Sequence, residues 1–280
     1  MTPFSEDTNS KMNAVELQDV CFAFDEHVIL DRVSFAVEPS GMRVLLGPSG
    51  SGKSILLKLI LGLYRPDSGR IFINGTRVDN LPERELLKIR ADVGMLFQET
   101  ALFDSLTVFE NVGYRLYEET DMPPDEAERR VQEVLGFVGL GDYADRMPSE
   151  LSGGQRRRVA IARAMAAKPG LLLFDDPTVG LDPVIATTVD DEIVKLRDLE
   201  RVTSIVVTHQ IRDAHYIATH AAVKNGDRVE IVDAGAEKSA HAVFMVLNEG
   251  RIQFEGSAEE LLASKDPYLE RFLFMTLPPW

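Results

Sequence analysis

Apolar residues recur along the chain with two spacings. Alternation of apolar and polar residues at 15–24 and 33–37 predicts antiparallel strands that each bury one face. Short runs that are apolar throughout predict strands buried on both faces, and they lie at residues 44–46, 93–97, 171–175 and 204–207. Helical spacing follows several of these runs, as in the segment that begins at Lys53 and in the segment 183–200. This alternation of strand and helix predicts a parallel sheet covered on both faces.

The middle of the chain has a different character. Residues 108–118 and 124–138 have helical periodicity, and two prolines and two acids open the second segment. No strand pattern interrupts them between 98 and 150, and an alanine-rich helix follows as far as Ala167. We therefore expect a helical sub-domain, about residues 98–168, inserted into the core.

Strand patterns return in the last third of the chain. Two antiparallel pairs are predicted, at 221–223 with 228–232 and at 243–248 with 251–255. An Asn-Gly turn at 225–226 joins the first pair, and small polar residues at 234–240 predict an exposed loop.

The fold class that follows is α/β, with a mostly parallel core sheet, an antiparallel β sub-domain and the inserted helical sub-domain. The predicted organisation is a flexible tail at 1–12, a single domain at 13–265 and an apolar C-terminal extension at 266–280. The apolar residues at 272–280 either seal their own domain or cover a second chain.

Composition narrows the classes of partner. Thirty Lys and Arg against 45 Asp and Glu give a formal charge of −15, so the chain repels phosphate backbones and nucleic acid is excluded as its main partner. The single cysteine, Cys21, allows no intrachain disulfide, fits a reducing cytoplasm and is interpreted as a core residue. No apolar run approaches the roughly 20 residues that span a bilayer. We expect a cytoplasmic chain that reaches the inner face of the membrane only through a partner.

A glycine-rich loop joins the apolar run 44–46 to the helical segment after it. It has the spacing Gly-x-x-x-x-Gly-Lys-Ser, and the predicted nucleotide-binding residues are Gly47, Pro48, Ser49, Gly50, Ser51, Gly52, Lys53, Ser54 and Ile55. Glycines let backbone N–H groups converge on phosphate oxygens, and the following helix adds its positive N-terminal end. Lys53 is expected to reach the terminal phosphates, and Ser54 to ligate Mg²⁺. The loop therefore predicts a site for a nucleoside triphosphate.

A second phosphate-seeking motif consists of Leu151, Ser152, Gly153, Gly154 and Gln155. Ser152 is a helix cap and the two glycines expose backbone N–H groups, so this helix start is another anion site. Since the chain already has a phosphate loop, a second such site indicates ATP held between two copies. The order of motifs over about 15–265 resembles that of ATP-binding-cassette (ABC) ATPase subunits, a branch of the P-loop NTPases. The resemblance implies a homodimer in which these five residues clamp ATP on the loop of the other subunit.

The resemblance implies roles for further residues. It gives catalysis to Lys53, Gln98, Asp176 and His209, the Mg²⁺ shell to Ser54, Gln98 and Asp175, and a contact with the second subunit to Asp182. Phe24 is similar to the aromatic residue that stacks on adenine, the alternative being a strand core residue. Gln98 alone would be a surface amide.

One position departs from the family pattern. Members usually have Asp-Glu at the end of the strand 171–175, where the glutamate acts as the general base, whereas this chain has Asp175 and Asp176. Asp176 is shorter by one methylene, which reduces its reach by roughly 1.5 Å. We expect an active ATPase whose turnover is slow.

Within the family, the chain most resembles the ATPases of Mla-type (Mkl-like) lipid transport systems, which serve permeases with MCE-domain partners. The similarity rests on residues 95–98, 101–112, 148–155 and 266–273. It implies phospholipid transport through a separate integral-membrane permease. The alternatives are the ATPase of another transporter, such as a small-solute importer or a lipoprotein-releasing exporter, and a soluble ABC ATPase of translation or DNA repair.

Four aromatic residues lie close to Gln98 in sequence, at Phe103, Phe109, Tyr114 and Tyr117. The segment 97–117 that holds them is the expected dock for the permease, because it follows the glutamine implied to sense the nucleotide. The alternative is that these rings fill the core of the helical sub-domain.

Overall fold

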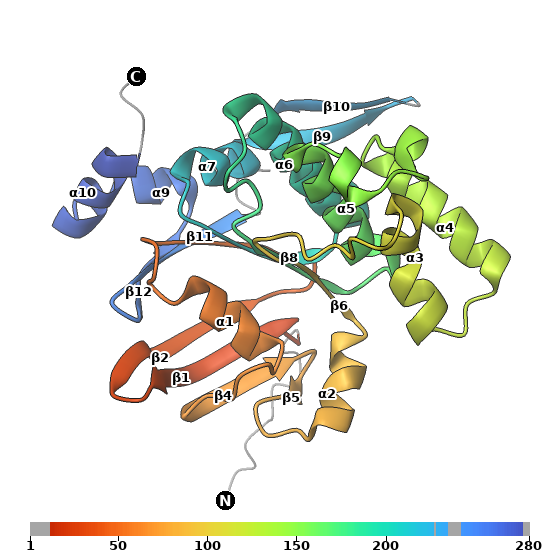
Figure 1. Ribbon diagram of the computed structural model, residues 1–280. Coiled ribbons are helices and arrows are strands. Elements are labelled where there is room, and N and C mark those ends of the chain that lie inside the picture. Colours follow the sequence, from red (N-terminus) through yellow and green to blue (C-terminus); the bar gives the residue numbers. More distant parts are fainter. Residues whose placement is uncertain (1–11, 227, 235–241, 277–280) are drawn as a thin grey trace, which may run out of the picture.

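A six-stranded sheet forms the centre of the computed structural model, which describes residues 12–226, 228–234 and 242–276 (Figure 1). Its strand order is β12-β11-β3-β8-β7-β6. The bounds, in that order, are Arg251–Gly256, Ala242–Asn248, Met42–Leu46, Thr203–Thr208, Leu171–Asp175 and Val93–Leu96. Strands β11 to β6 are parallel, and β12 pairs antiparallel with β11 at the edge. The carboxyl ends of β3, β7 and β8 therefore meet at one edge, where ligands bind in open α/β sheets.

A second sheet packs below the first and is antiparallel throughout, in the order β2-β1-β4-β5. Its bounds in chain order are β1 Val15–Phe24, β2 His27–Val37, β4 Ser68–Ile73 and β5 Thr76–Arg77. Helix α1 (Lys53–Ile60) lies between the two sheets, with Leu56, Leu57, Leu59 and Ile60 fully buried. Side chains alternate across β3, so Leu45 points into this core while Val44 and Leu46 point into the core on the other face.

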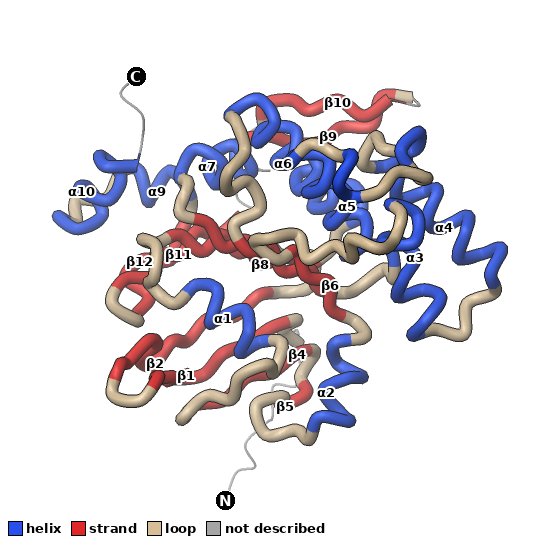
Figure 2. Tube along the Cα trace, viewed as in Figure 1, coloured by secondary structure: helices blue, strands red, loops and turns tan. Residues whose placement is uncertain are grey.

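Helices cover that other face of the central sheet (Figure 2). They are α3 Val108–Glu119, α4 Pro124–Phe137, α5 Gly153–Ala166, α6 Pro183–Lys195 and α7 Ile211–Thr219. Thr107 and Ser152 open α3 and α5 with capping boxes, in which side chain and backbone satisfy each other's polar groups. Helix α2 (Glu83–Arg90) leads into β6. The predicted helical region is thus present as α3, α4 and α5, while the exact limits of the sub-domains stay a prediction.

The C-terminal part adds a small hairpin and two helices. Strands β9 (His220–Asn225) and β10 (Arg228–Asp233) form a sheet of their own beside α6. After β12 come α9 (Ala258–Leu262) and α10 (Pro267–Thr276). In α10 the side chains of Leu269, Phe272 and Leu273 are buried in the core of their own chain, whereas Phe274 is 86% exposed.

The structure departs from the predicted pattern at three described places. Both predicted antiparallel pairs are present, β9 with β10 and β11 with β12, but β11 also pairs parallel with β3, which was not predicted. The helix predicted to reach Glu200 ends at Lys195, and a π-helical turn continues it. Cys21 is only half-buried, and its Sγ accepts a hydrogen bond from the backbone N–H of Arg32 at 3.2 Å, so its interpretation as a core residue is wrong. The predicted tail and the loop predicted at 234–240 lie outside the described residues, apart from Met12 and Ala234.

Candidate functional site

The loop after β3 depends on glycine at several positions. A Cβ atom on Gly47 would lie 2.4 Å from the carbonyl oxygen of Leu247. Gly52 caps α1 with φ 100°, and a Cβ there would lie 2.9 Å from Ile29 Cγ2. Gly50 also has a left-handed φ, of 80°. Glycine therefore allows the tight curl that leaves the first turn of α1 available to an anion.

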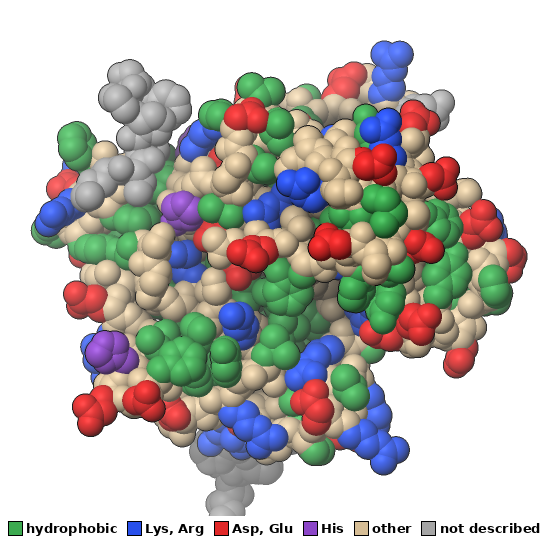
Figure 3. All heavy atoms as spheres, viewed as in Figure 1, with side chains coloured by type: hydrophobic (Ala, Val, Ile, Leu, Met, Phe, Trp, Pro, Cys, Tyr) green, Lys and Arg blue, Asp and Glu red, His purple; other side chains and the backbone are tan. Residues whose placement is uncertain are grey.

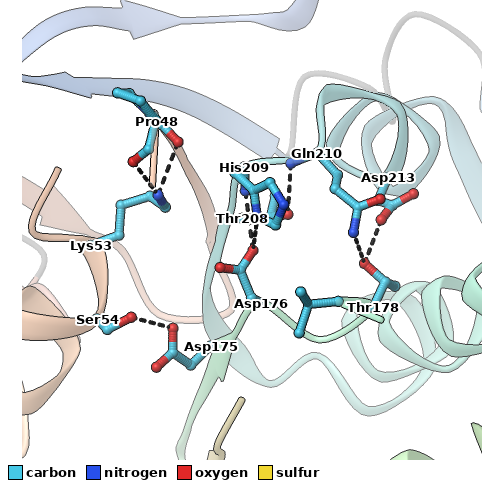
Figure 4. A network of polar contacts seen from close by, with 12 residues as sticks. Pro48, Lys53, Ser54, Asp175, Asp176, Thr178, Thr208, His209, Gln210 and Asp213 are labelled. Atoms are coloured by element: carbon cyan, nitrogen blue, oxygen red, sulfur yellow. Dashed lines mark hydrogen bonds and ion pairs between the residues drawn. The ribbon is translucent and has the colours of Figure 1, made fainter. Parts of the chain in front are cut away.

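Lys53, the first residue of α1, is almost completely buried. Its Nζ donates to the carbonyl oxygens of Gly47 and Pro48, each at 2.9 Å (Figure 4). Burial lowers the pKa of Lys53, and the nearby carboxylates of Asp176 and Asp175 oppose that shift. The loop thus holds a cation whose ionised form is stabilised by the acids at the end of β7.

Ser54 and Asp175 connect α1 to the end of β7. The hydroxyl of Ser54 donates to Asp175 Oδ1 at 2.7 Å (Figure 4). Burial raises the pKa of Asp175, and the Ser54 hydrogen bond acts in the opposite direction. A hydroxyl and a carboxylate are ligands that suit Mg²⁺. No cluster of three or more His, Cys, Asp and Glu among the described side chains is able to hold a metal, so a cation beside Ser54 and Asp175 would need ligands of another kind, such as amide, phosphate or water oxygens.

Asp176 and His209 join β7 to the loop after β8. His209 Nδ1 lies 2.8 Å from Asp176 Oδ1, and the backbone N–H of His209 donates to the same oxygen at 3.1 Å. Because an ionised carboxylate only accepts hydrogen bonds, Nδ1 carries a proton in this arrangement. The backbone of Asp176 is left-handed, with φ 44°, and its N–H donates to the carbonyl oxygen of Val207 at 2.8 Å. Asp176 is thus held in two ways, by its backbone N–H through Val207 and by its carboxylate through His209.

A buried polar group behind this pair was not foreseen from the sequence. Thr178 donates its hydroxyl to Asp213 and accepts a hydrogen bond from the Gln210 side chain at 3.2 Å (Figure 4). Asp213 is 1% exposed, and burial raises its pKa. The group links the turn after Asp176 to the first turn of α7. Its only signal in the sequence is the placement of Asp213 four residues after His209, which by itself indicates no contact.

Gln98 follows β6 and is exposed. Its side chain makes no hydrogen bond to any residue within 12–226, 228–234 and 242–276, so the structure does not bring it to Ser54 or Asp175. The chain after it is fixed by two buried or half-buried side chains. Arg163 donates to the carbonyl oxygens of Thr100 and Ala101, both at 2.7 Å, and Asn111 binds the backbone of 103–107 at four points. Neither residue was singled out from the sequence.

The five residues 151–155 form the start of α5, where the side chains of Ser152 and Gln155 each accept a hydrogen bond from the backbone of the other. Ser152 Oγ accepts from Gln155 N at 3.3 Å, and Gln155 Oε1 accepts from Ser152 N at 2.8 Å. A Cβ on Gly154 would lie 2.1 Å from Ile185 Cγ2, so α5 and α6 approach closely here. Asp182 caps α6 by accepting from two backbone N–H groups at 3.1 Å. In the described part of the chain, none of the hydrogen bonds of Ser152 and Gln155 reaches the phosphate loop.

Phe24, at the end of β1, is 44% exposed. Its ring contacts Phe22 and Tyr64 edge-on, with centroid distances of 4.9 and 5.7 Å. A partly exposed ring supported by two others offers an apolar face to a planar base. The stacking role of Phe24 stays a prediction, and Tyr64 was not foreseen as its neighbour.

Comparisons with known proteins place this chain in a known family. The model described as "ABC transporter" matches residues 30–179, more than half of the chain. Over 264 residues the chain is 36% identical to the intermembrane phospholipid transport system ATP-binding protein MlaF of Escherichia coli K12, covering 94% of this chain and 90% of that protein. It is also 36% identical to the chloroplastic protein TRIGALACTOSYLDIACYLGLYCEROL 3 of Arabidopsis thaliana, covering 92% and 72%. The methionine import ATP-binding protein MetN of Corynebacterium glutamicum is 43% identical, covering 80% and 60%.

Solved structures agree with this placement. A dimeric, post-hydrolysis structure of the ATP-binding cassette MJ0796 bound to ADP and Pi superposes with a TM-score of 0.71 at 31% identity, covering 87% of this chain and 98% of that one. The structure of CbiO1 from Clostridium perfringens, part of the ABC transporter complex CbiONQ, gives a TM-score of 0.76 at 25% identity, covering 95% and 96%. The predicted fold class is confirmed by these similarities.

Proposed function

The chain belongs to the ABC transporter family and is an ATP-binding, ATP-hydrolysing subunit of such a transporter, and from this premise we propose that it drives phospholipid transport through a separate membrane permease. The observation that carries the proposal is the identity of 36% to MlaF, because it extends over 94% of this chain. The MlaF name describes intermembrane phospholipid transport, and the plant relative matches at the same identity.

Phosphate binding falls to the loop 47–54 and Lys53. With an incoming phosphate, the Lys53 ammonium would exchange its two carbonyl partners for phosphate oxygens. Ser54 and Asp175, already in contact, would hold Mg²⁺ together with Gln98, which would have to move toward them. When bound, Mg²⁺ supplies charge neutralisation on the terminal phosphates.

Asp176 is the general base in this proposal. Its Oδ1 is occupied by His209, whereas Oδ2 has no hydrogen bond to any described residue and is free to accept a proton from water. Because the carboxylate is one methylene shorter than the usual glutamate, a residual misplacement of about 1 Å would cost on the order of 10²-fold in rate. Slow turnover and long-lived ATP-bound dimers follow.

A second copy completes each ATP site. The free backbone N–H groups at the start of α5 form an anion site that lies outside the hydrogen-bond network of Lys53, Ser54 and Asp175. We assign Ser152 and Gln155, with their neighbours 151–154, to ATP on the opposite subunit, with Asp182 at the same interface. The dimeric ATP-binding cassette among the structural relatives supports this arrangement.

The permease would dock beside α3. Hydrophobic side chains gather on the surface around α3 and α4 (Figure 3), and Phe103, Tyr114 and Tyr117 are each about 40% exposed. The Phe103 and Tyr114 rings are in contact, with centroids 4.7 Å apart. None of the described helices is long and apolar enough to cross a membrane. In this proposal the chain is therefore held at the inner face of the membrane by a permease, with an MCE-domain protein as a further component.

A small-solute importer is the second candidate. The methionine import protein of C. glutamicum has the higher identity, 43%, but the match covers only 80% of this chain and 60% of that protein. The lipid proposal accounts for more of the sequence, since the match to MlaF covers 94% of this chain.

The catalytic assignment is tested with Asp176→Asn. The amide retains the shape of the side chain but accepts no proton, so turnover should fall at least about 100-fold while ATP binding is kept. Steady-state phosphate release and binding of a fluorescent ATP analogue measure the two quantities, with Asp176→Glu as the matched control. Hydrolysis unchanged in the Asn variant would show that Asp176 is not the base.

The transport assignment is tested by affinity purification of the tagged chain from detergent-solubilised membranes. We expect a permease and an MCE-domain protein to co-purify, and ATPase activity of the complex to respond to phospholipid vesicles. Stimulation by methionine without a response to phospholipid would favour the importer, and purification of the chain without any membrane protein would overturn both candidates.

A further inference from the structure

Three consecutive arginines follow Gln155 on α5, and they make different contacts. Arg156 donates to the nearby carbonyl oxygen of Leu151 at 2.6 Å. Arg158 donates to the carbonyl oxygen of Val138, at the end of α4, at 2.9 Å. Arg157 reaches two distant segments at once. Its Nη1 donates to the carbonyl oxygen of Phe97 at 3.1 Å, and its Nη2 donates to that of Val179 at 3.2 Å.

The two carbonyl groups belong to segments that carry the chemistry. Phe97 immediately precedes Gln98, and its carbonyl also accepts from Thr100 N, which fixes the turn at 97–100. Val179 lies in the turn after β7, where its N–H donates to the carbonyl oxygen of Asp176. One guanidinium group therefore joins α5 to the backbone beside Gln98 and to the turn that begins at Asp176.

Arg157 is buried, with 6% of its surface exposed. Burial lowers its pKa, and the carboxylates of Asp176 and Asp175 act in the opposite direction. It makes no hydrogen bond to a carboxylate in the described residues, so backbone carbonyls are its direct partners. A buried cation held this way contributes little net stability compared with an apolar side chain of similar volume. Its geometric effect, the connection of three segments, is the more informative property.

We propose that Arg157 is a positioning residue that transmits displacement of α5 to Gln98 and Asp176, and so couples the two ATP sites of a dimer. This inference rests on the proposed function, in which residues 151–155 at the start of α5 touch ATP on the other subunit. A shift of α5 on closure moves Arg157, which lies two residues after Gln155 in the second turn of that helix. Through Phe97 and Val179 the shift reaches the groups that orient the attacking water on the opposite site.

The test compares Arg157→Gln and Arg157→Lys with Arg158→Gln in the full-length chain. Glutamine removes the charge and cannot bridge both carbonyl groups, and lysine keeps the charge but has no planar fork to bridge them. Arg158→Gln removes a neighbouring arginine of the same helix that donates to Val138 and lies near Glu192, but whose described hydrogen bond reaches neither Phe97 nor Val179, so it controls for general effects on α5. Each variant is measured for ATP-analogue binding stoichiometry, for kcat per binding site and for the Hill coefficient of hydrolysis against ATP concentration.

Both Arg157 variants should lose about ten-fold or more in kcat per binding site and shift the Hill coefficient toward 1, with the Kd for the ATP analogue within about two-fold of the wild type. Because kcat is expressed per occupied site, unfolded protein does not enter its value. A purely structural role of Arg157 would lower the number of occupied sites and leave kcat per occupied site unchanged. Wild-type kinetics in Arg157→Gln, full recovery in Arg157→Lys, or an equal loss in Arg158→Gln would each overturn the inference. A wild-type chain that shows no cooperativity and no dimer with ATP would instead overturn the proposed dimer, and this inference with it.

Discussion

The two halves of the proposed ATP site are held in different ways within one chain. In the half around the phosphate loop, Ser54 binds Asp175 across 121 positions of sequence, and Asp176 binds His209 across 33. In the half at the start of α5, Ser152 and Gln155 are three positions apart and bind each other. The first half is assembled by tertiary structure, and the second by a local helix cap.

This difference fits the tasks we assign to each half. Groups that must hold phosphate, metal and water in a fixed geometry are fastened to neighbouring strands of one sheet. Groups that must meet a ligand on another subunit are satisfied without it, so the start of α5 is stable while exposed. A side chain such as Arg157 is then needed to relate one half to the other.

The largest effect is expected from removal of the Lys53 amine, which belongs to the half around the phosphate loop. Lys53→Ala should weaken ATP binding by at least about 100-fold, because the variant loses the cation that is proposed to bind the terminal phosphates. Calorimetric titration with Mg-ATP measures the change. Lys88→Ala, at an exposed position on α2 where the lysine pairs with Glu85, is the control and should bind ATP normally. Equal affinity of the two variants would contradict the assignment of Lys53.

Mixing two inactive variants separates the halves. A Cβ on Gly153 would lie 3.3 Å from Leu181 Cδ2, a close contact that a small shift of the flexible Leu181 side chain relieves, and Gly153→Asp places a negative charge where phosphate should bind. Copies with Lys53→Ala and copies with Gly153→Asp should each be inactive. In a mixture with random pairing, half of the dimers would have one intact site, so one quarter of all sites would be intact and up to about one quarter of the wild-type rate should return. A mixture that remains inactive would show that the two halves act within one chain.

A buried acid outside both halves should affect stability instead of turnover. Asp190 is fully buried on α6, both of its carboxylate oxygens lack a hydrogen-bond partner among the described residues, and burial raises its pKa to about 9 with the charge of Asp213 adding to the shift. The folded state therefore keeps a proton that the unfolded state releases near pH 4. Between those pH values stability falls as pH rises, by up to about 1.4 kcal/mol per pH unit from this group.

Asp190→Asn removes that proton linkage. The variant should be more stable than the wild type at pH 8, and the difference should shrink toward pH 5, while kcat per site is unchanged. Urea unfolding at several pH values measures the effect. Asp125→Asn, at an exposed position on α4, is the control and should leave the pH profile as it is. A parallel pH profile in Asp190→Asn and the wild type would contradict the protonated state of Asp190.

The smallest effect on ATP affinity is expected at Phe24, beside the half around the phosphate loop. Loss of base stacking in Phe24→Ala should weaken ATP by about 1 kcal/mol, roughly five-fold. Phe24→Tyr retains the ring and should bind like the wild type. A Phe24→Ala variant with unchanged affinity for ATP would identify Phe24 as a partly exposed strand residue without a role in the site.

The sequence alone allowed prediction of those parts of the proposed site whose residues are neighbours in the chain. The glycine loop before Lys53, the helix cap at Ser152 and the strand that ends at Asp175 each show in a few neighbouring residues. The contacts of Arg157 and Asp213 do not, because their partners lie far away in sequence and include backbone carbonyl groups, which carry no residue identity. The parallel pairing of β11 with β3 was not predicted for the same reason, since β3 lies about 200 residues earlier in the chain.

The hydrogen bond from Asp176 N–H to the carbonyl oxygen of Val207 affects how fast the amide proton of Asp176 exchanges with solvent. Strand β8 is buried along its whole length between β3 and β7, so its amide protons belong to the set that exchanges with solvent only when the protein opens globally. The amide of Asp176 is tied to that strand by its hydrogen bond to Val207, so its proton should exchange about as slowly as those of β8 itself. The backbone at this end of the proposed site therefore keeps its position for as long as the protein stays folded.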